Sequence, residues 1–588
     1  MVKVKVVINS IPVEIEEGMT IFDAAQEIGI TIPTLCYLKG INKSGACRVC
    51  LVEIEGQRNL VTSCNYPVRD GLVVYTHSQR ALEGRKNSVA LLMSNHSKEC
   101  LSCTRNQRCE LQTLTSDLNV RRYDFNGSVT PISVDMLSHG IVRDTSKCIL
   151  CGRCVNTCKK MQGLGILGYE GRGFNTKVGP AMGLSLRDVN CIQCGQCVTA
   201  CPVAALTEKE AIHEVVSLIN DPQKHVIVQT APAVRAALGE EFGYPIGTRV
   251  TGKMVAALRQ AGFSKVYDTN FGADLTIMEE GTEFIHRIQE DGALPMITSC
   301  SPGWVRYIEF EYPELLDHLS SCKSPHMMLG AALKSHYAKQ KGIKTRDIYV
   351  VSIMPCTAKK SEIEREENKV NGIKDVDIVL TTKECARMIK MLGIDFNSLA
   401  DQEFDQDMFG EYSGAGVIFG TGGGVMEAAL RTVKELIEHK PLDKIEFEEV
   451  RSLDGIKEAS IEINGKEVFV AVASGMIHAK KLLEQIKDGT TKYQFIEIMG
   501  CPGGCINGGG QPQISSVLKN AKGAPDFRKL RAKALYDEDS NCLVRKSHEN
   551  KQIQELYSSF FGEPGSHLAH ELLHTTYSKK KRFGVFKE

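Results

Sequence analysis

Cysteine is the residue type that offers this chain of 588 residues most of its chemistry. The sequence contains 22 cysteines, and fifteen of them lie between Cys36 and Cys201, many separated by only two residues. A disulfide framework rarely repeats gaps of two residues, whereas the ligands of zinc and iron–sulfur centres commonly do. The spacing therefore predicts several metal centres in this part of the chain, held by thiols that stay reduced in the cytoplasm.

The first two groups of ligands differ in type. Four cysteines spaced C-x10-C-x2-C-x13-C are similar in order to plant-type ferredoxins and predict a [2Fe–2S] centre, although the plant gaps are C-x4-C-x2-C. A histidine followed by C-x2-C-x5-C predicts a [4Fe–4S] centre with one imidazole ligand if the segment between them is helical, and a Cys3His zinc site is the alternative. The two ligand sets are Cys36, Cys47, Cys50 and Cys64, then His96, Cys100, Cys103 and Cys109.

An internal repeat follows, with two runs of C-x2-C-x2-C-x3-C. This is the pattern of bacterial two-cluster ferredoxins, in which the fourth cysteine of each run binds the cluster of the other run. The repeat predicts two [4Fe–4S] centres, although only the second run has the following proline, Pro202, and Lys159 stands at that place in the first. One centre takes Cys148, Cys151, Cys154 and Cys201, and the other takes Cys191, Cys194, Cys197 and Cys158.

Three further loops carry cysteine beside proline or glycine. They read TSCSPGW over 298–304, MPCTAKK over 354–360 and MGCPGGC over 499–505. Cysteines on separate loops fit a buried cluster, and glycine lets the backbone approach it closely. Cys385 and Cys542 lie in no motif, and we interpret them as structural.

The elements that must position these residues divide the chain in two. Residues 2–8 and 11–16 alternate as half-buried strands and precede a short helix over 20–28. From residue 211, strand and helix patterns alternate, which predicts an α/β domain. Strands are expected over 225–229, 348–353 and 377–380, and helices over 252–262 and 426–439.

We therefore predict an α/β catalytic domain preceded by small α+β iron–sulfur domains. The expected boundaries are 1–80 for a plant-type ferredoxin-like domain, 81–126 for the His/Cys3 module, 127–210 for a two-cluster ferredoxin-like domain, and 211–588 for the catalytic domain.

Charge and motifs exclude several classes of function. The 71 basic residues balance 71 acidic ones, which gives no overall attraction to nucleic acid or an anionic membrane. No apolar stretch is long enough to predict a membrane span, and residues 1–10 read as a strand rather than a signal peptide. The glycines of 420–424 match no dinucleotide fingerprint, so nicotinamide or flavin chemistry is expected on a partner.

The three cysteine loops closely resemble those of iron-only, or [FeFe], hydrogenases, and the cluster order resembles the long clostridial-type enzymes along essentially the whole chain. The segment GSHLAHE over 565–571 also resembles the C-terminal part of that family. Residues 1–205 alone also resemble the large iron–sulfur subunit of respiratory NADH dehydrogenase and some formate dehydrogenases. Those proteins continue into a molybdopterin-type domain, so the three loops decide the class.

This resemblance implies an H-cluster, which is a [4Fe–4S] cube bridged by a cysteine thiolate to a di-iron unit with CO, cyanide and a dithiolate. By motif, Cys356, Cys501 and Cys505 would bind the cube, with Cys505 as the bridge. Lys359 would donate to a cyanide, since an ammonium suits a buried anionic ligand. Met354, Met499 and Pro232 would pack against the di-iron unit, although buried methionines are as often ordinary core.

The family's proton relay corresponds to Cys300, Glu280, Ser320 and Glu283. Glu280 and Glu283 lie three residues apart, on one side of a helix, and a thiol can exchange a proton near neutral pH. Without the resemblance, Glu279, Glu280 and Glu283 would read as a solvated helix face.

One position departs from the family. The first loop usually reads TSCCP, with the second cysteine binding the cube, and Ser301 stands there. We expect the cube to assemble nevertheless, with Ser301 as fourth ligand, Cys300 as second choice and Cys322 as third. An engineered change at this position is a further alternative.

The resemblance implies the reaction 2H⁺ + 2e⁻ ⇌ H₂, with one [2Fe–2S] centre, three [4Fe–4S] centres and the H-cluster. Ferredoxin, or a partner subunit that binds flavin and NAD(P), would exchange electrons through the N-terminal domain. A hydrogen sensor of low activity and a non-catalytic electron-carrying subunit are the alternative functions.

Overall fold

The computed structural model describes residues 2–121, 125, 127–290 and 292–581. The chain forms two compact units, each built from more than one stretch of sequence. The first comprises Met1–Val189, Gln196–Thr207 and Gln513–Pro525, and the second comprises Asn190–Gly195, Glu208–Pro512 and Asp526–Glu588. Part of the second cysteine run, Asn190–Gly195, thus belongs to the unit that carries the three cysteine loops.

The first unit opens with a mixed sheet in the order β2-β1-β5-β3-β4. The predicted first strands and helix are confirmed, because β1 and β2 pair antiparallel and α1 follows them. Thr20 caps α1, and its hydroxyl accepts a hydrogen bond from the Asp23 backbone at 3.1 Å. The bounds are β1 Lys3–Ile8, β2 Ile11–Glu16, α1 Ile21–Glu27, β3 Leu51–Ile54, β4 Val61–Thr62 and β5 Val73–Tyr75.

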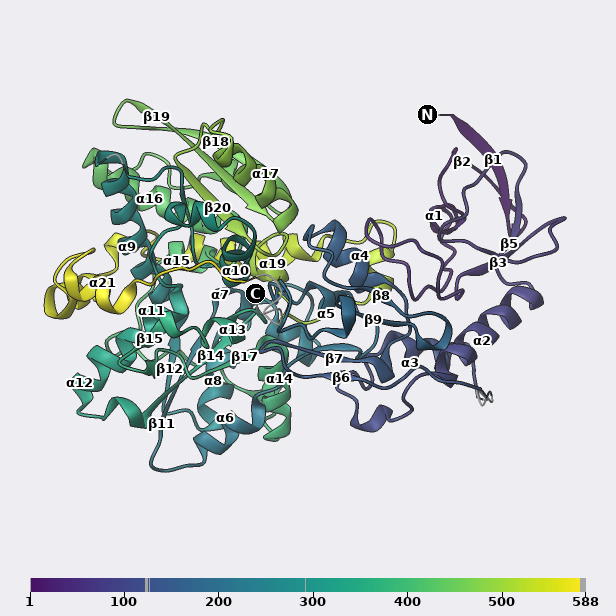
Figure 1. The fold of residues 1–588 in the computed structure, drawn as a ribbon, viewed down its shortest axis with the longest axis horizontal. Coiled ribbons are helices and arrows are strands. Elements are labelled where there is room, and N and C mark those ends of the chain that lie inside the picture. Colours follow the sequence, from purple (N-terminus) through teal and green to yellow (C-terminus); the bar gives the residue numbers. More distant parts are fainter. Residues whose placement is uncertain (1, 122–124, 126, 291, 582–588) are drawn as a thin grey trace. The chain divides into compact units, whose positions relative to one another are not determined.

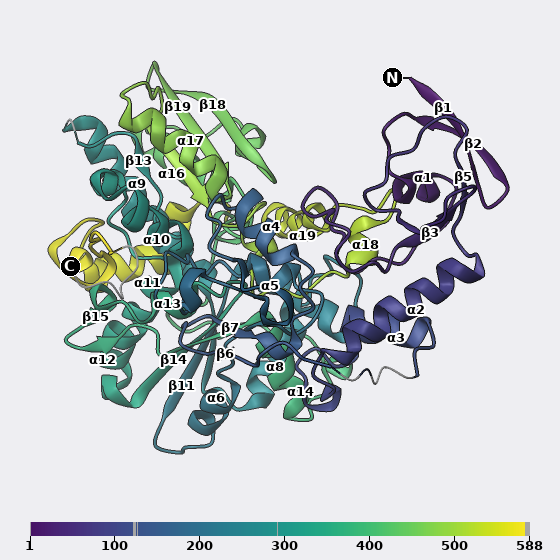
Figure 2. The same ribbon diagram turned by 45° about the vertical axis from the view of Figure 1, so that its right-hand side comes forward.

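The cysteine repeat is also a structural repeat. Helix α4 (Arg153–Lys160) carries the last two cysteines of the first run, and α5 (Gln196–Ala200) begins before the third cysteine of the second. The two short helices pack against each other. Figure 2 shows the longer α2 (Gln79–Ser94) beside β3, with α3 (Glu110–Asp117) next to it.

A four-stranded parallel sheet forms the first half of the second unit, in the order β12-β11-β14-β17 (Figure 1). Its strands are rich in Val and Ile and almost entirely buried, as in parallel sheets covered by helices on both faces. Val228 of β11 lies between Val266 of β12 and Val351 of β14. The bounds are β11 His225–Thr230, β12 Lys265–Asp268, β14 Ile348–Met354 and β17 Ile378–Thr381, which confirms the three predicted strands.

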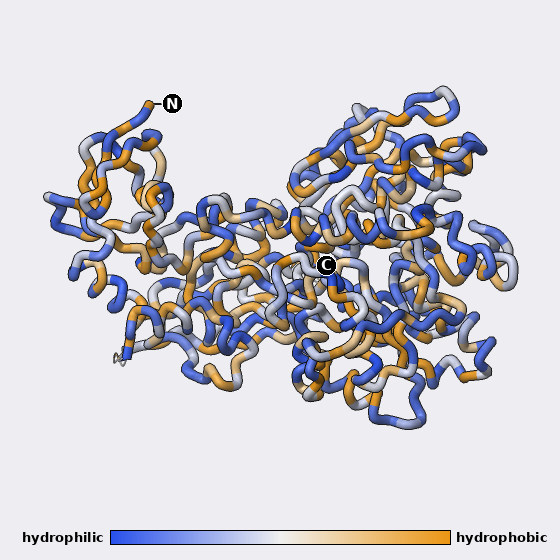
Figure 3. The backbone as a smooth tube through the Cα atoms, turned by 180° about the vertical axis from the view of Figure 1, so that it is seen from behind, coloured by the Kyte–Doolittle hydropathy of each residue, from blue (hydrophilic) through white to orange (hydrophobic). Residues whose placement is uncertain are grey.

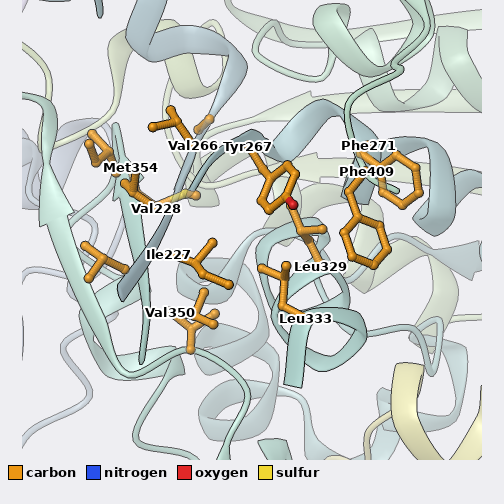
Figure 4. Packing of buried hydrophobic residues seen from close by; sticks show 14 of the residues in the cluster. Ile227, Val228, Val266, Tyr267, Phe271, Leu329, Leu333, Val350, Met354 and Phe409 are labelled. Atoms are coloured by element: carbon orange, nitrogen blue, oxygen red, sulfur yellow. The ribbon is translucent and has the colours of Figure 1, made fainter. Parts of the chain in front are cut away.

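Helices cover this sheet and complete its core. In Figure 4, Ile227 and Val350 of the strands lie toward Leu329 and Leu333, Val228 lies beside Met354, and Tyr267 faces Phe409. The predicted helices are present as α8 (Thr251–Ala261) and α16 (Gly424–Glu438).

A second sheet, β13-β20-β19-β18, carries the remaining loops of the catalytic unit. β13 pairs parallel with β20, and β20 pairs parallel with β19, while β18 closes the edge antiparallel. Helix α17 (Met476–Lys487) packs on β19. The strands are β13 Met296–Ile297, β18 Gly455–Ile463, β19 Lys466–Ser474 and β20 Phe495–Met499.

Helix α9 (Thr269–Gln289) has 21 residues and packs on α11 (Pro325–Ala332) and α16. Figure 3 shows short apolar stretches alternating with hydrophilic ones along the tube. Across the part of the chain that the structure describes, no helix combines the length and apolar character that crossing a membrane requires.

Candidate functional site

Pro232 and the three cysteine loops each follow the carboxyl end of a parallel strand. Pro232 comes just after β11, the loop of Cys356 follows β14, Cys300 follows β13, and the loop of Cys501 follows β20. In open α/β sheets, ligands bind at this edge of the strands. The two sheets thus present their loops as one site.

Hydrogen bonds tie these loops together. Lys359 Nζ donates to the Cys300 carbonyl at 3.2 Å, which joins the loop after β14 to the loop after β13. The Gly510 amide donates to the Pro355 carbonyl at 2.8 Å, which joins the loop after β20 to the loop after β14. Gln511 Nε2 donates to the Ala233 carbonyl at 2.8 Å and adds the segment after β11.

Cys356, Cys501 and Cys505 form no disulfide, and burial opposes ionisation of the Cys356 and Cys505 thiols. Burial raises the pKa of Cys505 to about 12, the charge of a neighbouring Cys356 thiolate adds to it, and Lys359 opposes it. Burial also raises the pKa of Cys356. A thiolate is disfavoured in such surroundings unless a cation compensates it, and iron bound to the sulfur would do so. The donor set and its burial fit the cube of an H-cluster.

Glycines make the loops close enough to enclose a cluster. A Cβ at Gly508 would lie 2.1 Å from the Pro355 carbonyl oxygen, and a Cβ at Gly504, where φ is +87°, would lie 2.6 Å from the Gly422 amide. Only glycine fits at these two positions, so the loop of Cys501 and Cys505 can lie directly on its neighbours.

Met354, Met499 and Pro232 are buried at the same strand ends. Met354 is the last residue of β14, Met499 is the last residue of β20, and Pro232 is the first residue of α7 (Pro232–Arg235). The structure therefore places all three around the loops of the candidate site.

Glu362, which the sequence motif did not reveal, anchors the lysine of the site. Its carboxylate lies 2.7 Å from Lys359 Nζ and 2.6 Å from His326 Nε2. Burial opposes ionisation of Glu362, but the lysine charge and the histidine outweigh it and lower its pKa to about 2. Burial, together with the charge of Lys359, lowers the pKa of His326 to about 4, so this histidine is neutral at pH 7.

The proton-side network comprises Cys300, Glu280, Ser320 and Glu283. Glu280 is 1% exposed, and the Ser320 hydroxyl and the Ser299 amide lie near enough to stabilise its carboxylate, although no described residue makes a hydrogen bond of ordinary geometry to it. Burial, reinforced by the charge of Glu283, raises its pKa to about 8. Ser320 Oγ donates to Glu283 Oε2 at 3.0 Å, and Arg287 binds the other oxygen at 2.6 Å.

Two interpretations of these residues need correction. Glu279 and Glu280 are each only 1% exposed, so the solvated helix face that the pattern alone suggested is wrong. The cause is that other segments cover α9: α11 and α16 pack on it, and Tyr557, Gly565 and His574 of the C-terminal segment bind Glu279. Burial and the charge of Glu280 also raise the pKa of the Cys300 thiol well above its ordinary value, so the thiol is neutral at pH 7 rather than close to its titration midpoint.

Ser301 faces the last cysteine loop. Its Oγ accepts a hydrogen bond from the Gly500 amide at 3.2 Å, next to Cys501, and it makes no capping bond to α10 (Pro302–Glu311). Cys322 is buried elsewhere, with its Sγ 3.8 Å from Glu283 Oε2.

The electron-side segment is residues 190–195, which bear Cys191 and Cys194. Thr357 Oγ1, next to Cys356, donates to the Gln193 carbonyl at 2.7 Å, and Cys501 Sγ lies 4.0 Å from the Cys194 carbonyl oxygen. A Cβ at Gly195 would lie 2.8 Å from Gly509 Cα. The backbone beside two predicted cluster ligands is therefore in direct contact with the loops of the candidate site.

In the first unit, the four cysteines of the first set converge. All four are buried, and the thiol of Cys36 lies within hydrogen-bonding reach of Cys47 and Cys64, as does that of Cys50 with Cys64. The structure thus brings this ligand set together.

Two further ligand sets lie in the first unit. A small cavity is lined by Cys148, Cys151, Cys154 and Cys201, the set predicted for one [4Fe–4S] centre. Among the described residues, none hydrogen-bonds to the buried Nδ1 of His96, as suits a ligand atom. The charge of Cys103 acts on Cys109. The expected helix between His96 and Cys100 is absent, because α2 ends at Ser94 and the next turn begins only at Cys100.

Backbone amides of Gly165, Ile166 and Leu167 point at the Cys158 sulfur, as suits a cluster thiolate. Its predicted co-ligand Cys197 lies in α5, which belongs to the same unit.

Family models match most of the chain. The C-terminal domain of the iron-only hydrogenase large subunit matches residues 224–509, and the small subunit of iron hydrogenase matches 525–580. Ahead of them, a 2Fe-2S binding domain matches 2–79, the NADH-ubiquinone oxidoreductase-G iron-sulfur binding region matches 85–123, and a 4Fe-4S dicluster domain matches 147–205.

Relatives extend this match over whole chains. The chain is 47% identical over 579 residues to the NADP-reducing hydrogenase subunit HndD of Solidesulfovibrio fructosivorans, covering 97% of both chains. It is 44% identical to iron hydrogenase 1 of Clostridium pasteurianum, covering 98% of this chain and 100% of that one.

A solved structure supports the catalytic fold. The apo [FeFe]-hydrogenase HydA1 from Chlamydomonas reinhardtii superposes with a TM-score of 0.56 and 43% identity, over 63% of this chain and 98% of that one. The predicted architecture is confirmed, with ferredoxin-like iron–sulfur domains ahead of a hydrogenase domain. With its cysteine loops at the strand ends and near-complete coverage by hydrogenase relatives, the chain belongs to the iron-only, or [FeFe], hydrogenases.

Proposed function

We propose that this hydrogenase catalyses 2H⁺ + 2e⁻ ⇌ H₂ at an H-cluster held by Cys356, Cys501 and Cys505, with Cys505 as the bridging thiolate. The observation that carries the proposal is that Cys356, Cys501 and Cys505 lie on loops after β14 and β20, which hydrogen bonds join to each other and, through Lys359, to the loop of Cys300. When bound, the H-cluster supplies the redox centre at which protons and electrons combine.

Lys359 serves as a fixed positive charge for an anionic ligand of the cluster. Its ammonium group is held by Glu362 on one side and by the Cys300 carbonyl on the other. This arrangement holds the donor in one orientation before an anionic ligand binds. Met354, Met499 and Pro232 exclude water from the same space.

Protons travel between the surface and Cys300 by way of Glu283, Ser320 and Glu280. The Glu280 carboxyl, with its pKa near 8, can take up and release a proton close to neutral pH. Cys300 holds a proton at the end of this route, because burial and the charge of Glu280 raise the pKa of its thiol and keep the sulfur protonated at neutral pH.

Ser301 is the fourth ligand of the cube, since its hydroxyl faces the loop of Cys501 rather than capping α10. Cys300 is the second candidate. Cys322 is the third, because it contacts Glu283 instead of the cysteine loops. We expect Ser301→Cys to raise cube occupancy, measured as iron per chain and by electron paramagnetic resonance. Unchanged occupancy would remove Ser301 from the ligand set.

The H-cluster belongs to the predicted segment 211–588, and the remaining centres follow the three predicted segments 1–80, 81–126 and 127–210. One [2Fe–2S] and three [4Fe–4S] centres with the H-cluster give about 20 irons per loaded chain. Iron near zero with stoichiometric zinc would contradict this assignment.

Electrons enter through the N-terminal domain from ferredoxin or from a partner subunit that binds flavin and NAD(P). The name of the NADP-reducing relative, which is a subunit, supports a multi-subunit arrangement. We place the protein in the cytoplasm, where its 22 thiols stay reduced.

Hydrogen turnover by the matured chain with a reduced viologen tests the proposal. Fast turnover supports the enzyme. Weak turnover would favour the hydrogen sensor, for which Ser301 in place of the usual cysteine is the motivating observation. No turnover despite full maturation would favour an electron-carrying subunit.

A further inference from the structure

Glu283 forms hydrogen bonds with Ser320, Ser321 and Arg287. Its Oε2 accepts from Ser320 Oγ at 3.0 Å and from Ser321 Oγ at 3.2 Å, while its Oε1 binds Arg287 at 2.6 Å. The Ser321 amide also donates to both oxygens. The proton-side network uses the hydrogen bond to Ser320. The hydrogen bonds to Ser321 are therefore available to connect Glu283 to other residues.

Ser321 leads to a buried histidine that is hydrogen-bonded on both sides. Ser321 Oγ lies 2.8 Å from His574 Nδ1, and His574 Nε2 lies 3.0 Å from Glu279 Oε2. Glu279 in turn accepts from the Tyr557 hydroxyl at 2.5 Å and from the Gly565 amide at 2.8 Å. A continuous chain of donors and acceptors therefore runs from Glu283 to Glu279.

The C-terminal segment fixes this histidine in place. His574 forms a β-bridge with Cys322, and the Thr575 amide donates to the Ser321 carbonyl at 2.8 Å. The Lys323 amide donates to the Leu573 carbonyl at 2.8 Å. These backbone contacts fix the position of His574, and their register places Ser321 beside its ring.

The types of these side chains suit proton transfer. Imidazole can accept a proton on one nitrogen and release one from the other, and a serine hydroxyl can rotate between donor and acceptor roles. On α9, Glu279 and Glu283 are four residues apart and therefore lie on one face. No electron moves along the chain, since each step breaks one O–H or N–H bond and forms the next.

His574 also lies close to the surface. It is 8% exposed, and the ring of His570, an exposed residue on α21 (His567–Leu573), stacks on it at 4.5 Å. The titratable groups that face it are Glu279 and Glu283 from α9, Cys322 from the paired segment, Tyr557 and His570.

We propose that Ser321, His574 and Glu279 form a second branch of the proton route, which collects protons beside His570 and joins the first branch at Glu283. This inference rests on the proposed role of Glu283 in carrying protons toward Cys300. The branch matters most in alkaline solution, where protons are scarce and a second collecting group raises their supply.

The test uses His574→Gln, which keeps one donor and one acceptor but cannot carry a proton, and Ser321→Ala, which breaks the link. The control is His567→Gln, which changes an exposed histidine of α21, the helix that carries His570. In the matured full-length protein we expect hydrogen production from reduced viologen to fall about tenfold at alkaline pH and little at acidic pH. This is less than the 10²–10⁴-fold typical of a positioned acid–base group.

Three further results sharpen the test. Ser321→Thr, which keeps a hydroxyl, should restore the pH profile, and the double variant should lose no more than either single variant, because the residues act as one unit. In protein without the H-cluster, the infrared band of protonated carboxyl groups should titrate at a different pH in His574→Gln than in the natural chain.

The outcomes separate this inference from the proposed function. If Cys300→Ala and Glu280→Gln lose turnover while Ser321→Ala and His574→Gln keep the natural pH profile and carboxyl band, the branch is overturned and the main route stands. If Cys300→Ala keeps near-normal turnover, the proposed route itself fails. Unfolding of His574→Gln would leave Ser321→Ala and Ser321→Thr to decide.

Discussion

The electron-side segment and the proton-side network approach the same cysteine loops with opposite chemistry. On the electron side, backbone carbonyls of Gln193 and Cys194 contact Thr357 and Cys501, and the close approach depends on glycines. On the proton side, carboxyl, hydroxyl and thiol groups follow one another from Glu283 to Cys300. Electrons can cross close packing without titratable groups, whereas protons need a donor and an acceptor at each step.

The largest effect is expected on the proton side, from Cys300→Ala. The change removes the thiol that we propose as the last proton carrier of the route. Turnover should fall by about 10²–10⁴-fold, the usual contribution of a positioned acid–base group. Infrared bands of CO and cyanide in the matured variant should persist, and turnover close to that of the natural chain would assign the role to another group.

Glu280→Gln should also block proton transfer, and in addition it should change stability with pH. The pKa of Glu280 is raised from an ordinary value near 4.5 to about 8, so the folded state loses stability as pH rises from about 4.5 through about 8. Glu280→Gln removes this loss, which is on the order of 1 kcal/mol per pKa unit.

Denaturant unfolding at pH 5 and pH 8 measures the difference. The control is Glu290→Gln at the exposed end of the same helix. Equal stability changes at the two pH values would mean that Glu280 ionises normally in the folded protein.

Deletion of residues 1–80 separates electron entry from chemistry. It removes the predicted [2Fe–2S] centre but leaves the cysteine loops and the proton-side network. Reduction by ferredoxin or a flavin-containing partner should drop at least tenfold if residues 1–80 receive the electrons, as we propose, while turnover with viologen remains. Equal loss with both donors would place the entry point elsewhere or show that the deletion unfolds the catalytic unit.

Gly195→Ala should produce the smallest effect, confined to the electron side. A Cβ there would lie 2.5 Å from Thr357 Oγ1 and 2.8 Å from Gly509 Cα, and φ is +71°. Gly243→Ala is the matched control, since its φ is +88° and nothing lies within 4 Å of the added Cβ.

The overpacked variant should be less stable than the control by about 1–3 kcal/mol. Its electron transfer should slow a few-fold without a change in the pH profile of turnover. A changed pH profile would mean that the two sides are not separate.

Local patterns carried much of this architecture. Alternation of apolar residues was enough for β1 and β2, and buried runs of Val and Ile were enough for β11 and β14. The tight cysteine spacings grouped the candidate ligands before any fold was known, and the structure brings Cys36, Cys47, Cys50 and Cys64 together.

Contacts between segments far apart in the sequence could not be predicted from such local patterns. His574 meets Ser321 only because the C-terminal segment pairs with the residues after Leu319, 253 positions earlier in the chain. Glu279 read as solvated because nothing in its own helix indicates that Tyr557, Gly565 and His574 bind its carboxylate. Glu362 had a weak signal, its i,i+3 spacing from Lys359, but its partner His326 lies on another element.

Infrared spectroscopy of the matured full-length protein tests most directly whether the two sides meet at an H-cluster held by Cys356, Cys501 and Cys505. We predict CO and cyanide bands that change when hydrogen or reduced viologen is added, and that vanish when Cys505 is replaced by Ala. A matured protein that has filled N-terminal clusters and no such bands would contradict the account.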